Sequence, residues 1–244
     1  MSDLFIYNGF GITPSKNFTA AGYDFHIPYI TDESKFDFVL EAFKKSFKID
    51  QNEIEETINL INLYLESNFD IHEFSKCDLL NILHLFLALT PADDVYPGEE
   101  GELQPLPEAV DEFVTYRLIF DDKFVPGIIV YAGDYLLFNS GIKVCLPVNT
   151  AGIFFNKSGK GNQGFDTRAC VVDEDYSGYV HLSQAFDKEV FDGVNIYCGD
   201  KLAQMVVLPV VKTEIKEVEE SIYSDMMSNS ERGSDGFGSS DVKH

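Results

Sequence analysis

Short apolar runs separated by turns follow one another closely over the second half of the sequence. Strands at such short intervals are typical of an all-β sandwich or barrel and argue against a parallel α/β sheet. The segments expected to form strands are Ile128–Val130, Tyr135–Phe138, Ile142–Leu146, Gly152–Phe155, Ala169–Val172, Tyr179–Leu182, Val194–Tyr197 and Leu202–Pro209. The chain from about residue 121 is therefore predicted to be mainly β.

Three successive segments of the first half carry apolar residues three and four positions apart, the spacing of amphipathic helices. The first helix carries one apolar stripe, formed by Phe36, Val39, Leu40, Phe43 and Phe47. The second begins at Asp50 with Glu53 in the capping-box position, and the third begins near Ser75 with Asp78 placed likewise. Because the three stripes have to be buried, we expect residues 31–120 to form a self-contained helical insertion.

The segments beside these patterns have other compositions. Residues 93–107 are acidic and rich in Gly and Pro, which indicates a loop, and strand-like sequence resumes at Phe113–Ile119. Beyond Val211 the chain is acidic and then rich in Ser and Gly, with few residues that could form a core. We expect residues 212–244 to be a mobile C-terminal arm.

The charge of the chain limits its partners. Acidic residues outnumber basic ones by 41 to 18, giving a formal net charge of −23. Binding of polymeric DNA or RNA draws on clustered Lys and Arg, so a nucleic-acid surface is not expected. A mononucleotide is compatible with this charge, because a few basic residues and a divalent cation can neutralise its phosphates locally.

Other classes of protein are disfavoured by the apolar runs, the cysteines and the histidines. The sequence has neither a run of about eighteen apolar residues nor a start like a signal peptide, so we expect no membrane contact and a cytoplasmic location. The four cysteines include no close CxxC pair, and the five histidines lack the spacing of metal ligands. No metal held by protein side chains is therefore expected.

Five short segments, each common by itself, combine acids, bases and glycines: Ala21–Asp24, Asn156–Gly159, Val172–Gly178, Gly199–Gln204 and Arg232–Gly238. In this order they resemble the motifs of the trimeric dUTP pyrophosphatase (dUTPase) family, and two of them are similar to the bacteriophage versions, which would place the protein in a host cytoplasm. The resemblance implies a β jelly roll formed by residues 1–30 and 121–211. It also implies a homotrimer that hydrolyses dUTP to dUMP and pyrophosphate, with Mg²⁺ arriving on the triphosphate.

The resemblance also assigns roles to the segment Val172–Gly178, which we expect to be the tip of a β-hairpin. Asp173 stands where the family's general base activates the water that attacks the α-phosphorus. Tyr176 stands where a tyrosine packs beneath the deoxyribose and excludes a 2'-hydroxyl. The family's usual asparagine before this segment is absent, and Thr167 occupies about that place.

The remaining motifs supply the implied contacts to the phosphates. Lys157, Ser158 and Gly159 resemble the family's phosphate loop, although an arginine is more usual than Lys157, and a lysine cannot form bidentate hydrogen bonds. Asp24 would pair with Lys157, and the amide of Gln204 would lie near the phosphates.

In the family the C-terminal arm closes over the site. By this resemblance Phe237 would stack on uracil and Arg232 would contact the γ-phosphate. Asp235 departs from the family's usual glycine, and its charge could weaken closure.

Two alternatives remain open. A dCTP deaminase would share the jelly roll, but the motifs around its catalytic glutamate are not visible in the sequence. A regulatory protein of the same fold would bind a protein partner through the helical insertion, with its old site weakened by Lys157 and Asp235.

Overall fold

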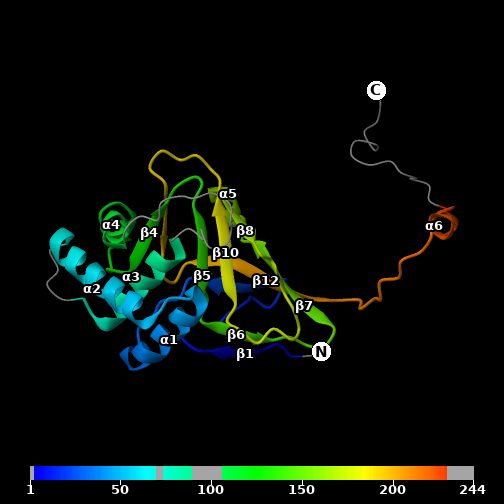
Figure 1. The fold of residues 1–244 in the computed structure, drawn as a ribbon, viewed down its shortest axis with the longest axis horizontal. Coiled ribbons are helices and arrows are strands. Elements are labelled where there is room, and N and C mark those ends of the chain that lie inside the picture. The colour runs from blue at the N-terminus through cyan, green and yellow to red at the C-terminus, as the bar shows by residue number, and fades with distance from the viewer. Residues whose placement is uncertain (1–2, 70–73, 90–105, 230–244) are drawn as a thin grey trace. The chain divides into compact units, whose positions relative to one another are not determined.

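The computed structural model describes residues 3–69, 74–89 and 106–229. Figure 1 shows its helices and strands. The helical elements are η1 (Glu33–Lys35), α1 (Phe36–Phe47), α2 (Gln51–Asn68), α3 (Lys76–Leu89), α4 (Leu106–Glu112), η2 (Phe113–Arg117), α5 (Ser158–Gln163) and α6 (Glu220–Met226).

The three predicted helices are confirmed as α1, α2 and α3. Asp50 caps α2, because its carboxylate accepts hydrogen bonds from the first-turn amides while the Glu53 side chain accepts one from the Asp50 amide. Ser75 and Asp78 bond to each other in the same way at the start of α3. These reciprocal bonds satisfy amides that a helix leaves free in its first turn.

The prediction of a strand over residues 113–119 is wrong for most of that segment. Residues Phe113–Arg117 form the π-helical turn η2, and only Leu118–Phe120 is a strand. Phe113 and Val114 are buried, and the ring of Phe113 packs edge-on against Phe86 of α3 at 5.3 Å. Contact with α3 thus overrides the β-propensity of the segment.

Four antiparallel sheets make up the β part of the fold, and their strand orders are β1-β6, β5-β10-β8, β11-β4-β3 and β2-β12-β7-β9. The strands predicted in the second half are present with shifted ends, and β8 is additional. Strands β1 and β2 lie within residues 1–30, which were expected to belong to the jelly roll. The bounds are β1 Phe5–Asn8, β2 Tyr23–His26, β3 Leu118–Phe120, β4 Pro126–Val130, β5 Tyr135–Asn139, β6 Ile142–Cys145, β7 Thr150–Asn156, β8 Phe165–Arg168, β9 Val171–Val172, β10 His181–Phe186, β11 Val194–Tyr197 and β12 Lys201–Pro209.

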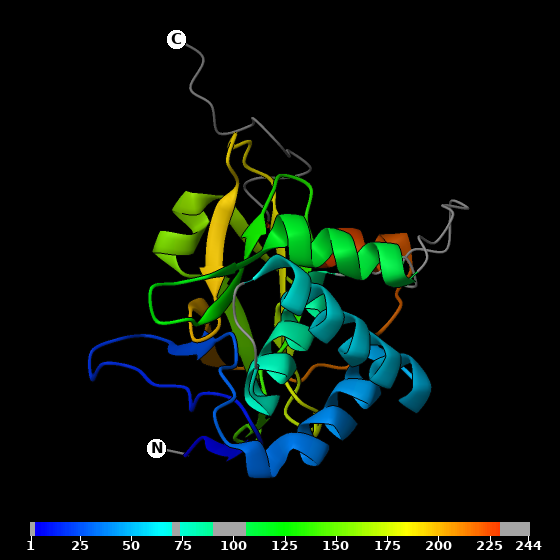
Figure 2. The same cartoon turned by 90° about the vertical axis from the view of Figure 1, so that its left-hand side faces the viewer.

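The helical segment shares one hydrophobic core with the strands. Helices α1–α4 lie together on one side of the sheets (Figures 1 and 2), and α3 contacts β4 and β5. Asn81 of α3 is 1% exposed and bonds to both the amide and the carbonyl of Ile30, at 2.8 Å each. The expectation of a self-contained helical subdomain is therefore corrected, because the apolar face of α3 is covered by strands as well as by helices.

A buried histidine lies at the junction between the helices and the strands. His84 of α3 is 1% exposed, stacks on Phe43 at 4.8 Å and accepts a hydrogen bond from the Asn139 amide at 3.2 Å. Its Nδ1 atom is buried without a hydrogen-bond partner among the described residues. Burial, with a smaller contribution from nearby His181, lowers the pKa of His84 to about 3. The imidazole is therefore neutral in the folded protein near pH 7.

Acid is expected to destabilise the fold through His84. Its pKa of about 3 lies below the ordinary value of 6.5, so between these values the unfolded chain binds more protons than the folded one. The contribution of His84 is fully present above pH 6.5 and decreases as the pH falls toward 3. Urea unfolding should show that lowering the pH from 7 to 5 costs the unaltered protein about 2 kcal/mol more than it costs His84→Gln. Equal losses in the two proteins would contradict this account of His84.

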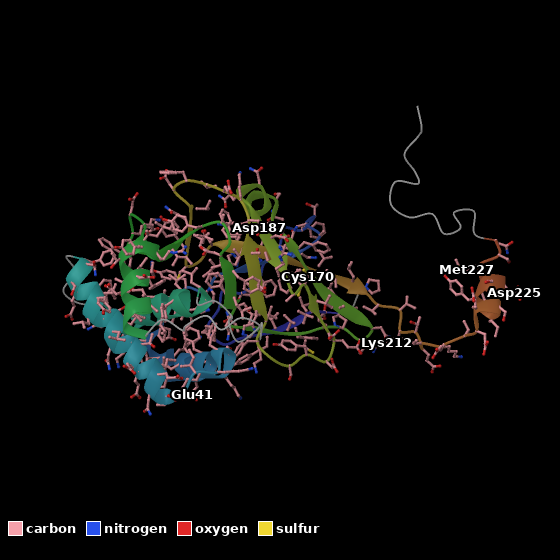
Figure 3. All side chains as sticks on the ribbon, turned by 45° about the horizontal axis from the view of Figure 1, so that its top comes forward. Glu41, Cys170, Asp187, Lys212, Asp225 and Met227 are labelled. Carbon is pink, nitrogen blue, oxygen red and sulfur yellow. The ribbon has the colours of Figure 1, made fainter. Side chains whose placement is uncertain are left out.

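Residues from Val211 onward form a second unit, separate from residues 1–210. Within it, the two-turn helix α6 was not predicted from the sequence. All its described side chains are exposed, including those of Asp225 and the adjoining Met227 (Figure 3). Over the described residues, no helix is both long and apolar enough to span a membrane.

Candidate active site

Strand β12 brings together three residues that are far apart in the sequence. It pairs with β2 on one side and with β7 on the other, so that Gln204 lies opposite Asp24. Lys157 follows β7 directly, at the end of that strand nearest to Gln204. The amide of Gln204 points toward the carbonyl of Asn156, at a long 3.4 Å. Asp24 and Gln204 thus lie on paired strands, and Lys157 directly follows the strand on the other side of β12.

The carboxylate of Asp24 forms ion pairs with two lysines. It is 2.6 Å from Lys157 Nζ and 2.9 Å from Lys201 Nζ, which confirms the predicted pairing with Lys157. Partial burial by itself raises the pKa of Asp24, but the hydrogen bonds and charges of the two lysines outweigh it, and the pKa is lowered overall. Asp24 is therefore ionised near pH 7 and fixes the two ammonium groups. Lys201 was not predicted from the sequence, because local pattern does not reveal strand register.

The expected loop at residues 157–159 is instead the start of a short helix. Ser158 and Gly159 form the first turn of α5, and Lys157 precedes it with an extended backbone. A Cβ atom added to Gly159 would meet nothing within 4 Å, so the surface beside it is open. Lys160 of the same helix is 3.0 Å from Asp200. Lys157, Lys160, Lys201, Asp24 and Asp200 are called the lysine cluster below, and they carry three positive and two negative charges.

The loop that carries Asp173 joins two different sheets, so the predicted β-hairpin is wrong. Strand β9 belongs to the sheet of β7, whereas β10 belongs to the sheet of β5. Within the loop, the Tyr176 amide donates to the Asp173 carbonyl at 3.2 Å and closes a turn. The Glu174 carboxylate accepts a hydrogen bond from the Asn149 amide, which ties the loop to the turn before β7.

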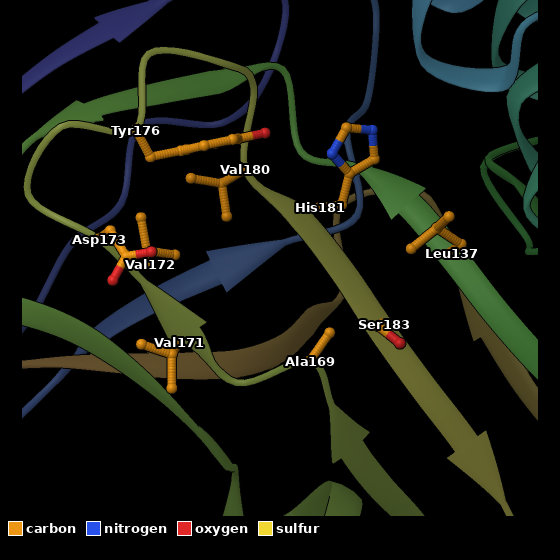
Figure 4. A pocket seen from close by; sticks show the side chains of 9 residues that line it. All are labelled: Leu137, Ala169, Val171, Val172, Asp173, Tyr176, Val180, His181 and Ser183. Atoms are coloured by element: carbon orange, nitrogen blue, oxygen red, sulfur yellow. The ribbon is translucent and has the colours of Figure 1, made fainter. Parts of the chain in front are cut away.

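Asp173 and Tyr176 line the same cavity, which is called the loop pocket and has a volume of about 180 Å³. Figure 4 shows Asp173 and Tyr176 on one side of it, with His181 and Leu137 on the other. The side chains of Asp173 and Tyr176 are exposed, so both can reach a bound molecule. The lining residues are Leu137, Ala169, Val171, Val172, Asp173, Tyr176, Val180, His181 and Ser183.

Gly178 allows the ring of Tyr176 to fold back along the loop. A Cβ atom at residue 178 would lie 2.5 Å from the hydroxyl oxygen of Tyr176 and 2.7 Å from its Cζ atom. Any side chain at residue 178 would therefore displace the ring. The hydroxyl group of Tyr176 also donates a 2.8 Å hydrogen bond to the carbonyl of Tyr179, which fixes the far end of the side chain.

Asp173 and Lys157 lie at opposite ends of β7. Val172 pairs with Gly152, so Asp173 lies beyond the level of Ala151, whereas Lys157 follows the far end of the strand. Six residues of extended chain span about 20 Å. Within one chain, Asp173 and Lys157 are therefore too far apart to contact adjacent phosphates.

The structure does not place all of the predicted site residues, and it adds some that were not predicted. Arg232, Asp235 and Phe237 lie outside the described residues. Among the residues that the structure does describe, no group of three or more His, Cys, Asp or Glu residues could hold a metal ion. Leu137, His181 and Ser183 of the loop pocket were missed by sequence reasoning, because their positions depend on how β5 and β10 pair.

Residues 118–241 match the family model described as dUTPase. The chain belongs to the dUTPase family. The matched range begins at β3 and contains Lys157, Asp173, Tyr176 and Gln204, and it excludes Asp24 and helices α1–α4. The expected jelly roll with an added helical region is thereby confirmed as the fold class.

Individual relatives are similar to this chain over part of their length. The deoxyuridine 5'-triphosphate nucleotidohydrolase of Candida albicans is 36% identical over 104 residues, which cover 42% of this chain and 62% of that protein. The human mitochondrial protein of the same name is 29% identical over 161 residues, covering 62% of this chain and 60% of that protein. The chain thus matches less than two thirds of either relative. Among solved structures, a dUTPase of Staphylococcus bacteriophage 80alpha is 24% identical, with a TM-score of 0.40 over 48% of this chain and 81% of that one.

Proposed function

We propose that the protein hydrolyses dUTP to dUMP and pyrophosphate, at sites that form between the chains of a homotrimer. The observation that carries the proposal is that the loop pocket joins Asp173 to Tyr176 within a chain of the dUTPase family. One residue supplies a carboxylate for the reaction, and the other supplies a ring for recognition of the sugar.

Asp173 is the proposed general base. Its carboxylate is exposed at the edge of the loop pocket, where it can hold a water molecule. As the water oxygen attacks the α-phosphorus, its proton passes to Asp173 and the bond from the α-phosphorus to the bridging oxygen breaks. Pyrophosphate leaves with the electrons of that bond, and dUMP remains.

Tyr176 is the proposed sugar-recognising residue. Its ring borders the loop pocket, lies in the space left by Gly178 and is held by the hydrogen bond to the Tyr179 carbonyl. A ring fixed in this way can pack against a deoxyribose and leave no space for a 2'-hydroxyl.

Truncation of this ring should weaken the preference for deoxyribose. We expect Tyr176→Ala to narrow the gap between the kcat/KM values for dUTP and UTP by roughly 10-fold or more. Tyr116→Ala, which truncates an exposed tyrosine on η2, serves as the control and should leave the gap unchanged. If Tyr176→Ala rejects UTP as strongly as the unaltered protein does, the steric role of this ring is wrong.

The lysine cluster is the proposed binding site for the phosphates. Asp24 holds Lys157 and Lys201 with their ammonium groups close together, and Ser158, Gly159 and Gln204 lie on the same or neighbouring elements. Ammonium, hydroxyl and amide groups can all donate to phosphate oxygens. The cluster is thus a local concentration of positive charge on an acidic chain, which suits a mononucleotide.

Mg²⁺ fits this site as an ion carried by the nucleotide. Asp24 and Asp200 are engaged by lysines, so the cluster offers no free set of carboxylates, and Mg²⁺ commonly keeps its waters and binds phosphate oxygens. When bound, the ion would neutralise charge on the triphosphate. The arm residues Arg232 and Phe237 keep their proposed roles at the γ-phosphate and the base.

The distance between the two halves of the site supports a shared arrangement. Because Asp173 and Lys157 lie about 20 Å apart along β7, a nucleotide in the loop pocket would meet the lysine cluster of another chain. A site of this kind is incomplete in a single chain. A shared site requires an oligomer, and the resemblance to the trimeric dUTPase family supports the proposal of a homotrimer.

Mixing two inactive variants should restore activity. Asp173→Asn removes the base and Lys157→Met removes a phosphate contact, so each homogeneous protein should be nearly inactive. In trimers formed from equal amounts of both, about one site in four receives an intact Asp173 and an intact Lys157 from different chains. We expect pyrophosphate release from dUTP to rise to roughly that fraction. A mixture that is no more active than its components, although mixed trimers have formed, would contradict the shared site.

A further inference from the structure

Tyr179 lies where the loop that carries Asp173 returns to the core. The next residue, Val180, is 1% exposed. The carbonyl of Tyr179 accepts the hydrogen bond of the Tyr176 hydroxyl at 2.8 Å. His181, which also lines the loop pocket, follows two residues later as the first residue of β10. The position of the Tyr176 ring in the pocket wall therefore depends on the backbone of Tyr179.

The ring of Tyr179 connects this backbone to the helical segment. It packs against Phe10 with ring centroids 5.5 Å apart, and Phe10 packs edge-on against Phe43 of α1 at 5.6 Å. The ammonium group of Lys143 lies 4.9 Å from the centroid of the Tyr179 ring. Aromatic pairs at these separations hold each other in preferred orientations. A continuous set of packed rings thus joins α1 to the loop.

Gly9 shows how closely this junction is packed. A Cβ atom at residue 9 would lie 2.6 Å from the hydroxyl oxygen of Tyr179 and 3.2 Å from Cε1 of Phe38 on α1. The backbone of residue 9 is thus wedged between the loop and the first helix. A shift of either one would be transmitted to the other, because the space between them is filled.

We propose that Tyr179 is a positioning residue, whose ring holds the loop so that Tyr176 stays over the pocket, and through which α1 supports that position. The proposal rests on the proposed function only for the role of Tyr176 in sugar recognition. It gives the helical segment a part in the site although none of its residues lines the loop pocket.

Two variants remove the packing, and two others serve as controls. Tyr179→Leu and Phe10→Leu each remove one ring of the pair, whereas Tyr179→Phe keeps the ring and the backbone carbonyl. Phe113→Leu is the matched control, because Phe113 and Phe10 are both 4% exposed and each packs against another ring, that of Phe86 in the case of Phe113. All four variants remove side-chain atoms, and only the first two remove a ring from the contact between Tyr179 and Phe10.

Amide hydrogen exchange of the nucleotide-free protein tests the position of the loop directly. We expect exchange over residues 174–180 to become roughly 10-fold faster in Tyr179→Leu and Phe10→Leu, with little change in Tyr179→Phe and Phe113→Leu. Equal exchange in all five proteins would overturn the proposal, and so would a similar acceleration in Phe113→Leu.

The kcat/KM ratio of dUTP to UTP tests the consequence for the site. It should fall roughly 10-fold in Tyr179→Leu and Phe10→Leu and stay unchanged in the two controls. An unchanged ratio in a protein whose loop exchanges faster would overturn the link between Tyr179 and Tyr176. Absence of dUTP hydrolysis by the unaltered protein would refute the proposed function instead, and the exchange comparison would still decide whether Tyr179 positions the loop.

Discussion

Asp173→Asn is expected to reduce the turnover of dUTP by roughly 10²-fold or more, while nucleotide binding is largely kept. Asparagine preserves the shape of the side chain, but its amide cannot accept the proton of the attacking water. The loss should appear in kcat, measured as pyrophosphate released under saturating dUTP.

Asp175→Asn is the matched control for this variant. Asp175 lies two residues further along the same loop, is exposed as Asp173 is, and is not among the residues that line the loop pocket. We expect its removal to leave kcat within roughly 2-fold of the unaltered value. Near-normal turnover of Asp173→Asn, or an equal loss in Asp175→Asn, would show that Asp173 is not the base.

Replacement of residues 31–120 by a Gly-Ser linker is expected to abolish the folded state. The segment contains α3, whose buried residues include Leu80, Leu83 and Leu85, and burial of each such side chain contributes about 1.5–3 kcal/mol. The summed contribution of such side chains is comparable to the ~5–15 kcal/mol that stabilises a typical domain. It would also expose the apolar faces of β4 and β5, against which α3 packs. Urea unfolding followed by circular dichroism should therefore show no cooperative transition.

Two smaller changes also test which parts of the chain the fold requires. Asn81→Leu removes only the hydrogen bonds to Ile30 and leaves a buried amide and carbonyl unpaired, which should cost about 2–5 kcal/mol. Truncation after Ser230 removes no described residue of the core and should leave the unfolding free energy unchanged. A linker variant that keeps its β-type circular dichroism and unfolds cooperatively would show that the helical segment is dispensable for the fold.

Local pattern predicted the helices and most strands because their signals lie within a few residues. The apolar stripe from Phe36 to Phe47 and the capping residues Asp50 and Glu53 each specify a helix without help from the rest of the chain. The contacts that join the helices to the strands are long-range. The hydrogen bonds of Asn81 with Ile30 and of His84 with Asn139 each join residues more than 50 positions apart. No local pattern predicts them.

Sequence reasoning named residues that the structure brings into two groups, Asp24 with Lys157 and Asp173 with Tyr176, but it revealed less of their geometry. The resemblance pointed to the pairing of Asp24 with Lys157, which are 133 residues apart, because the motifs carried it. It did not reveal Lys201, whose place beside Asp24 depends on the register of β2 and β12. Sequence reasoning also missed that the Asp173 loop crosses from one sheet to another. The sequences of its flanking strands look alike whether or not the two strands pair with each other.

The central claim is best tested by measuring pyrophosphate release from dUTP beside dCTP, dTTP, dATP and dGTP, in the presence of Mg²⁺. The account predicts a kcat/KM for dUTP that exceeds each of the others by roughly 10²-fold or more, with dUMP as the second product. Ammonia released from dCTP would instead indicate a deaminase. Equal rates with all five nucleotides, or no hydrolysis of dUTP by the protein, would contradict the account.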